Sequence, residues 1–377
     1  MADTKADESI SAAEHAQAMA SYIREGNERA RALGNRGPIR LGGDGKLAGD
    51  IIEAYWQHGF YVFENVISNE ELAELRADVE RILAGAPASP EGDTQFALPS
   101  FRFEKPLSDP YGGTTKNKGR HPVKMLGPKP GDDAPDLTVA NFLGNLQLMP
   151  SCLNLYGHHG LLTAAESIMG ADFVPYNEVT FVKEPALGPS VAWHQDGTTH
   201  WDAPDWDQGA HGYNSMAQLY PSTAGNCVWV LPGTHKLGKV DIKQLMADSG
   251  SERLEGAVPM LCEAGDVFIT NRQLVHGSFA NSSPDRRITL NAGFFPRRRV
   301  QDVTTSKLDG TVATYDGDWI DARCRMIPIA VDARQQRFPD EPRYTYQPLA
   351  GQTEQNRWNE QTQQELVRDY SLWDFYI

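Results

Sequence analysis

The segment Trp193-His194-Gln195-Asp196-Gly197 contains residue types that can do chemistry. Residues two apart on an extended strand point to the same face, so the His194 imidazole and the Asp196 carboxylate would share a side. Another histidine, His276, follows 82 positions after His194. Two histidines and one carboxylate are the ligand set of non-haem Fe(II) oxygenases, which leaves metal positions open for a co-substrate and O2. The pattern predicts an iron site made of His194, Asp196 and His276.

An arginine follows this set at a useful distance. Arg287 lies 11 positions after His276, at the start of a β-prone run that ends at Phe295. A keto acid that chelates iron at one end has a distal carboxylate, and a guanidinium matches a carboxylate with two parallel hydrogen bonds. Arg286 is adjacent, so a shift of one residue would exchange the two arginines. We expect Arg287 to face the site.

The elements that must position these residues are mostly strands. Between residues 171 and 300, short β-prone runs alternate with Gly and Pro, which predicts several short strands and favours a sandwich or barrel over a doubly wound parallel sheet. The predicted strands are 179–183, 191–194, 215–220, 227–231, 267–270 and 287–295.

Helices are predicted on either side of this region. Ala, Glu, Gln and Arg dominate 12–33, and apolar residues share one face in 47–56 and again after Ser68, where Ser68 and Glu71 have the capping-box spacing. Helical character returns in 142–169 and in 353–370. The aromatic residues of 372–377 are expected to pack on the body of the protein.

Four segments together resemble the phytanoyl-CoA dioxygenase (PhyH) family of Fe(II)/2-oxoglutarate-dependent oxygenases. They are WHQDG at 193–197, GNCVWVLPGTHKLG at 225–238, AGDVFITNRQLVHGSFANSS at 264–283 with Arg287, and HGFYVFENVISNEELAELRADVERI at 58–82. The resemblance covers roughly 47–300 and diverges at 86–140 and 198–224. It implies a double-stranded β-helix, a cupin-like jelly roll with flanking helices that carries the metal at one mouth.

The resemblance also implies roles for particular residues. His194, Asp196 and His276 would bind Fe(II), and Arg287 would bind the C5 carboxylate of 2-oxoglutarate. Ser278 resembles a further contact to that carboxylate, and Gln195 matches the family residue between two ligands. Asp196 is the carboxylate that related halogenases lose, so halogenation is disfavoured.

Other residues near the motif are candidates for the substrate side. Lys183 matches a family lysine near the mouth of the site, and His200 and Trp201 belong to an aromatic loop that is a candidate wall or lid. Loop packing and a strand-edge lysine are the plainer interpretations of these residues. His235, in a turn after a strand, is expected to be structural.

The chain divides into three parts by composition and sequence pattern. Residues 1–45 are a helical leader with a Gly-rich linker, 46–300 form the oxygenase domain, and 301–377 are a C-terminal extension on the core. Within the domain, 86–140 is rich in Pro, Gly and Asp and is predicted to be an insertion or lid.

Composition restricts the partners. The formal net charge is −15, which disfavours nucleic acid, and no apolar run approaches the ~20 residues that span a bilayer. Four widely spaced cysteines indicate free thiols in a reducing cytoplasm. A small-molecule substrate and a monomer or homodimer are expected.

The activity that follows is hydroxylation of an unactivated C–H bond in a small or medium organic metabolite, with O2 as oxidant and release of succinate and CO2. Two alternatives stay open. A zinc hydrolase with the same three ligands would leave Arg287 without a role. A non-catalytic jelly-roll binding protein would release no succinate.

Overall fold

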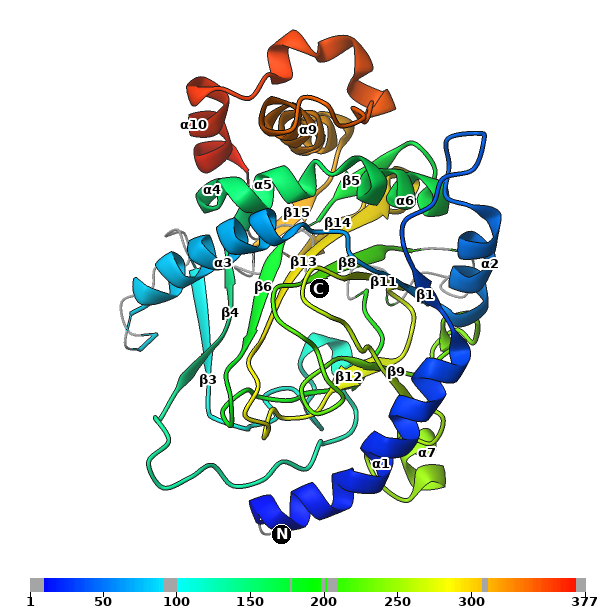
Figure 1. The fold of residues 1–377 in the computed structure, drawn as a ribbon, viewed down its shortest axis with the longest axis vertical. Helices are drawn as coiled ribbons and strands as arrows, with labels where there is room; N and C mark the ends of the chain where they lie inside the picture. The colour runs from blue at the N-terminus through cyan, green and yellow to red at the C-terminus, as the bar shows by residue number, and fades with distance from the viewer. Residues whose placement is uncertain are drawn as a thin grey trace.

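Two facing β-sheets form the centre of the computed structural model (Figure 1). The structure describes residues 10–87, 89–90, 100–176, 178–197, 201, 209, 211–306 and 311–370. The larger sheet has the order β1-β2-β11-β8-β13-β6-β4-β3, with β5 paired to β13, and the smaller sheet has the order β10-β9-β12-β7. The eight strands β6 to β13 divide equally between the two sheets, with β6, β8, β11 and β13 in the larger one. This is the double-stranded β-helix, and all pairs within these eight strands are antiparallel.

The strand bounds are as follows. The larger sheet contains β1 (Arg36–Gly37), β2 (Phe60–Phe63), β3 (Ser100–Glu104), β4 (Thr138–Leu143), β5 (Phe173–Pro175), β6 (Val179–Lys183), β8 (Tyr213–Gln218), β11 (Val267–Asn271) and β13 (Arg287–Pro296). The smaller sheet contains β7 (Val191–His194), β9 (Trp229–Val230), β10 (Val258–Pro259) and β12 (His276–Ser278). A separate pair consists of β14 (Thr304–Ser306) and β15 (Val312–Thr314).

Helices cover the larger sheet in layers (Figure 1). The helix α6 (His159–Met169) packs on β5, β8 and β13, and α5 (Pro150–Tyr156) packs between α3 (Asn69–Ala84) and α9 (Met326–Arg337). Their apolar faces join the sheet in one large core, because each buries a stripe of Leu, Ile, Val and Ala. The other helices are α2 (Gly49–His58), α4 (Asn145–Leu148), α7 (Ile242–Ser249), α8 (Gly317–Cys324) and α10 (Glu360–Asp369).

The N-terminal helix α1 (Ala12–Leu33) packs on the smaller sheet and is not a loosely attached leader. Met19, Tyr22 and Gly26 are buried, and the Tyr22 ring stacks on Trp229 with centroids 4.5 Å apart. A Ser11 capping box begins the helix and Gly34, in the left-handed region, ends it. The amphipathic pattern predicts the helix, and the partner sheet explains why one face is buried.

Several sequence-based expectations are confirmed and others need correction. The strands at 179–183 and 191–194 and the Ser68–Glu71 capping box are as predicted. The helical character expected over 142–169 is confirmed from residue 145 onward, where it is divided among α4, α5 and α6, while residues 138–143 form the strand β4. Within the region 86–140, which was predicted to be an insertion or lid, residues 100–104 form β3, and β4 begins at residue 138, so both strands extend the larger sheet. The residues 371–377 lie outside the described part.

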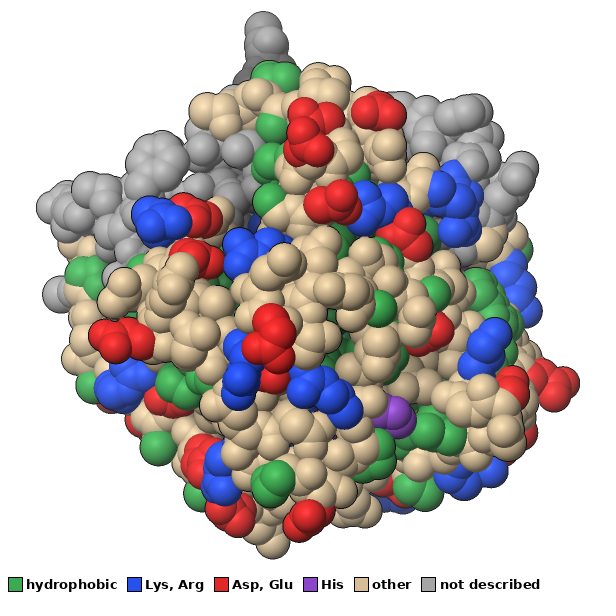
Figure 2. All heavy atoms as spheres, turned by 90° about the horizontal axis from the view of Figure 1, so that it is seen from above, with side chains coloured by type: hydrophobic (Ala, Val, Ile, Leu, Met, Phe, Trp, Pro, Cys, Tyr) green, Lys and Arg blue, Asp and Glu red, His purple; other side chains and the backbone are tan. Residues whose placement is uncertain are grey.

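The surface carries charges of both signs. Figure 2 views the end of the molecule that bears α9 and α10, where Lys or Arg side chains lie beside Asp or Glu side chains. One such group joins α9 to α3, where Arg337 pairs with Glu70 and Glu74. Among the described residues, no helix is both long enough and apolar enough to cross a bilayer.

Candidate metal and co-substrate site

His194 and His276 meet because their strands pair. His194 ends β7 and His276 begins β12, and the two are directly opposite in the antiparallel register. Their ring centroids are 4.2 Å apart, so the long sequence gap closes within one sheet. Both side chains are buried, His194 at 6% exposure and His276 at 8%.

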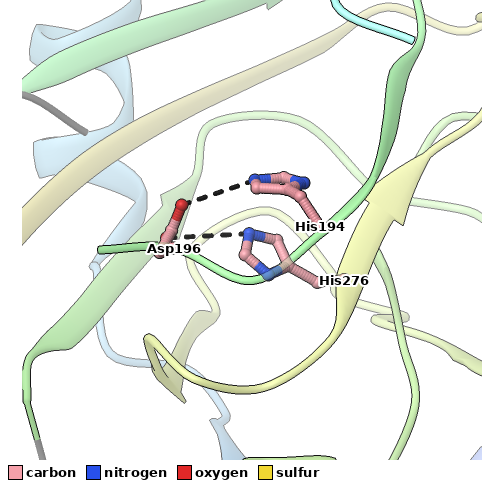
Figure 3. A group of neighbouring side chains, drawn as sticks. All are labelled: His194, Asp196 and His276. Carbon is pink, nitrogen blue, oxygen red and sulfur yellow. Dashed lines mark ion pairs between the residues drawn. The ribbon is translucent and has the colours of Figure 1, made fainter. Parts of the chain in front are cut away.

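Asp196 completes the group just beyond the end of β7 (Figure 3). Its Oδ1 lies 3.4 Å from His194 Nε2 and its Oδ2 lies 3.7 Å from His276 Nε2. The Asp196 backbone N–H donates to the Arg272 carbonyl at 2.8 Å, which fixes the chain where it leaves the strand. Two imidazole nitrogens and one carboxylate oxygen within 4.8 Å of one another match the donor set for a non-haem iron.

Each imidazole is oriented by its own strand. His194 Nδ1 lies 2.8 Å from the Ala192 carbonyl, and His276 Nδ1 lies 2.9 Å from the Leu274 carbonyl. A carbonyl only accepts, so Nδ1 carries the proton in both rings. Nε2 of each ring therefore carries the free lone pair, and both Nε2 atoms face Asp196. Such hydrogen bonds behind a ligand fix its tautomer and direction.

The charges of the group also suit a cation. Burial lowers the pKa of His276 to about 4, assisted by the neighbouring His194, so the ring is neutral at pH 7. Burial alone would raise the pKa of Asp196, but Arg272 and the two imidazoles hold it well below its ordinary value. The group therefore offers a neutral His276 nitrogen and a negative Asp196 oxygen, the forms that bind a metal.

A second cross-strand pair lies in the facing sheet. Arg287 begins β13 and Lys183 ends β6, and the two are opposite in register. Lys183 Nζ reaches across to the smaller sheet, where it donates to Ser278 Oγ at 2.8 Å and to the Phe279 carbonyl at 2.6 Å. The two cations and Ser278 therefore form one polar group that joins the sheets. Arg286 points elsewhere, to Glu80 and Glu184, so the register places Arg287 inside.

Lys183 and Arg287 could together bind an anion. Lys183 is 3% exposed and Arg287 is 4% exposed, and neither has a carboxylate within ion-pair distance in the part of the chain that the structure describes. Arg287 donates once, to the Asn226 carbonyl at 2.9 Å, and its buried Nε has no partner. Burial lowers the pKa of Arg287 to about 10, and burial together with Arg287 lowers the pKa of Lys183. A carboxylate from a ligand would satisfy both groups.

The two pairs open on one cavity of about 510 Å³. This volume lies within the usual range for small-molecule sites. His194, Asp196, His276, Lys183, Ser278 and Arg287 line it. Its further walls combine the rings of Phe101, Phe103, Tyr111, His121 and Phe181 with charged and polar side chains that include Arg102, Glu104, Arg120 and Asn141.

The segment between β3 and β4 places a column of rings on the metal group. His121 stacks on His194 with centroids 4.2 Å apart, Tyr111 stacks on His121 at 5.1 Å, and the Arg102 guanidinium lies 4.4 Å from the Tyr111 ring centroid. His121 is buried, and its Nδ1 has no hydrogen-bond partner in the part of the chain that the structure describes. No periodicity or motif singles out His121, so sequence reasoning does not predict its place in the site.

Two of the candidates, Gln195 and Trp201, are not among the residues that line the cavity, and a third lies outside the described part of the chain. Gln195, expected beside the cofactor, instead donates to the carbonyls of Gly238 and Gln273 and accepts from the Val240 N–H. It braces the loops behind the site, because the residue between two same-face ligands points away. The Lys239 ammonium lies 4.8 Å from the centroid of the Trp201 ring, and Trp201 is not among the described residues that line the cavity. His200 lies outside the described residues.

Two other candidates are placed clearly. Lys183 lies beside Arg287 in the interior and not at the mouth of the site. His235 is 3.1 Å from the Trp56 carbonyl through Nε2, in agreement with its expected structural role.

A double-stranded β-helix with two histidines and one carboxylate at the end of its smaller sheet defines a non-haem iron oxygenase of the 2-oxoglutarate-dependent class. The profile of the phytanoyl-CoA dioxygenase (PhyH) family matches residues 55–289, and the chain belongs to this family. Iron, 2-oxoglutarate and O2 are its cofactor and co-substrates.

Individual relatives are distant. The chain is 26% identical over 271 residues to the ectoine dioxygenase of Bordetella parapertussis, which covers 64% of this chain and 74% of that one. It is 24% identical over 260 residues to the phytanoyl-CoA dioxygenase of Arabidopsis thaliana, covering 66% and 88%. The crystal structure of EctD from S. alaskensis with 2-oxoglutarate and 5-hydroxyectoine aligns with a TM-score of 0.49 and 16% identity, covering 72% and 83%.

Proposed function

We propose that this protein hydroxylates an unactivated C–H bond of a small or medium organic molecule. The observation that carries the proposal is the pairing of two sites across one cavity, a three-ligand metal group in one sheet and a carboxylate-binding pair of cations in the other. The substrate C–H bond, 2-oxoglutarate and O2 would give an alcohol, succinate and CO2. Bound iron supplies the activation of O2 that this reaction needs.

Each residue has a distinct task in this proposal. His194, Asp196 and His276 would hold the iron. Arg287 and Lys183 would bind the C5 carboxylate of 2-oxoglutarate, because both cations are buried, adjacent and without an acidic partner among the described residues. Ser278 accepts a hydrogen bond from the Lys183 ammonium and would so orient it toward that carboxylate.

The ring column would orient the substrate. His121 lines the cavity beside the metal group, where its ring can contact the substrate. The phenylalanines at 101, 103 and 181 supply an apolar surface for part of the molecule. Arg102, Glu104 and Asn141 line the same cavity, so the substrate would have both an apolar part and polar groups. The four cysteines of the protein are buried free thiols, which supports a reducing cytoplasm as the location of the protein.

The experiment that tests the proposal is anaerobic titration of the purified protein with Fe(II) and 2-oxoglutarate. We expect a visible charge-transfer band in the wild type, none in His194→Ala, and a weaker one at equal 2-oxoglutarate in Arg287→Ala. Arg286→Ala is the matched control, because this side chain pairs with Glu80 and Glu184 and lies over the Tyr220 ring, and none of these residues is among those that line the cavity.

Other outcomes would favour the alternatives. A wild type that forms no band when loaded with iron contradicts the proposal. Zn(II)-dependent hydrolysis with no effect of Arg287→Ala would indicate a hydrolase. A band without succinate release under air, for any candidate substrate, would indicate a binding protein.

A further inference from the structure

A chain of buried polar side chains leads along the cavity wall to Asp196, since Asn291, Tyr176 and Asn214 all line the cavity. Asn214, the second residue of β8, donates from Nδ2 to Asp196 Oδ2 at 2.9 Å. Asn214 Oδ1 accepts from the Tyr176 hydroxyl and from Arg272 Nη1, the latter at 3.4 Å. Asn214 and Arg272 are each 1% exposed and Tyr176 is fully buried. None of these residues is a metal ligand, and the reaction as described above does not use them.

The chain has one direction. An amide has a single acceptor oxygen, and two donors on Asn214 Oδ1 fix which end of the amide faces Asp196. Asn291 Nδ2 donates to the Tyr176 hydroxyl at 3.0 Å, so that hydroxyl must give its own proton to Asn214. Every hydrogen bond from Asn291 to Asp196 therefore points toward the carboxylate.

Arg272 contacts both the same chain of side chains and the Asp196 backbone. Its guanidinium lies 4.4 Å from the Tyr176 ring centroid and 5.0 Å from that of Phe295, so it is packed between two rings. Its carbonyl accepts the Asp196 N–H. The backbone and the side chain of Asp196 are thus held by one buried cluster.

We infer that Tyr176 and Asn214 are positioning residues that hold the Asp196 carboxylate toward the two imidazoles. A carboxylate on a short side chain rotates freely unless its oxygens are hydrogen-bonded, and a ligand that must be ordered on binding costs affinity. Asn214 supplies the hydrogen bond, and Tyr176 keeps the Asn214 amide in the only orientation that can donate. The inference rests on the proposed function, since it takes His194, Asp196 and His276 as metal ligands.

Metal binding in the absence of turnover tests the inference. We would measure Co(II) and Fe(II) affinity by anaerobic calorimetry, the visible spectrum of the Co(II) form, and the melting temperature of the metal-free protein. Asn214→Ala should weaken metal binding about 10- to 100-fold and Tyr176→Phe about tenfold, each with an altered Co(II) spectrum, as is typical of losing a partner of a ligand.

The matched control is Tyr213→Phe. Tyr213 precedes Asn214 on the same strand and is fully buried, and its hydroxyl has no hydrogen-bond partner among the described residues, so this variant should bind and absorb as the wild type does. Should Asn214→Ala fail to fold, Tyr176→Phe decides alone, since it removes one oxygen and keeps the ring.

Two results would overturn the inference. One is wild-type affinity and spectrum in Tyr176→Phe, and the other is an equal loss in Tyr213→Phe, which would show general loosening of the core. A wild type that binds neither metal contradicts the proposed function instead.

Discussion

At the scale of single residues, the two neighbouring arginines provide a direct comparison. Arg287→Lys keeps the charge and loses the planar fork, so 2-oxoglutarate should bind at least tenfold more weakly, given about 1.5–3 kcal/mol for a hydrogen bond to a charged group. Arg286→Lys, at the surface between Glu80 and Glu184, should change this affinity by less than about twofold. Titration of the Fe(II) chelate band with 2-oxoglutarate measures both, and equal losses would argue against the assignment.

Residue types, the two-residue spacing of His194 and Asp196 and the family resemblance around His276 predicted the metal ligands, although Asp196 lies just beyond the end of its strand. The same reasoning placed Gln195 at the cofactor, yet its amide turns to the loops behind. His121, Tyr176 and Asn214 could not be predicted. Their importance comes from contacts across strands and loops that no local spacing encodes.

At the scale of elements, the contact between α1 and the smaller sheet depends on one missing side chain. A Cβ at Gly26 would lie 2.4 Å from Trp229 Cη2 and 2.6 Å from its Cζ3. Alanine normally stabilises a helix over glycine by about 1 kcal/mol, but here overpacking of about 1–3 kcal/mol opposes that gain. We expect Gly26→Ala to lower the free energy of unfolding, measured with urea.

Gly49→Ala is the control for this change. Gly49 begins α2 and faces open space, so alanine there should leave stability unchanged or raise it. A stabilised Gly26→Ala would mean that α1 does not pack closely on Trp229. The sequence predicted α1 from its composition but not its docking, because the partner residues lie some 200 positions away.

At the scale of the whole molecule, Glu178 ties the C-terminal helices to the larger sheet. It accepts a hydrogen bond from the Tyr370 hydroxyl at 2.8 Å, next to β6. Burial raises the pKa of Glu178 from its ordinary value of 4.5 to about 7, against the opposing effect of Arg323. Between about pH 4.5 and 7 the folded protein thus holds a proton that the unfolded chain has lost.

Glu178 should therefore make the protein less stable as the pH rises through this interval, by about 3 kcal/mol in total. Glu178→Gln should remove that slope and be the more stable protein at pH 8, in urea unfolding measured from pH 5 to 8. Glu166→Gln, which also loses a carboxylate bonded to a tyrosine hydroxyl, should keep the wild-type slope. An unchanged slope in Glu178→Gln would mean that Glu178 ionises in the folded state as it does in the unfolded chain.

The four buried cysteines can serve as probes of local unfolding in different parts of the molecule. All four are free and buried, with Cys152 and Cys324 in the core shared by the larger sheet and its helices. Cys227 and Cys262 lie in the two clusters around the smaller sheet. A thiol reagent can react only when a layer opens. Labelling rates at each cysteine would therefore show whether the two sheets open in one cooperative step or separately.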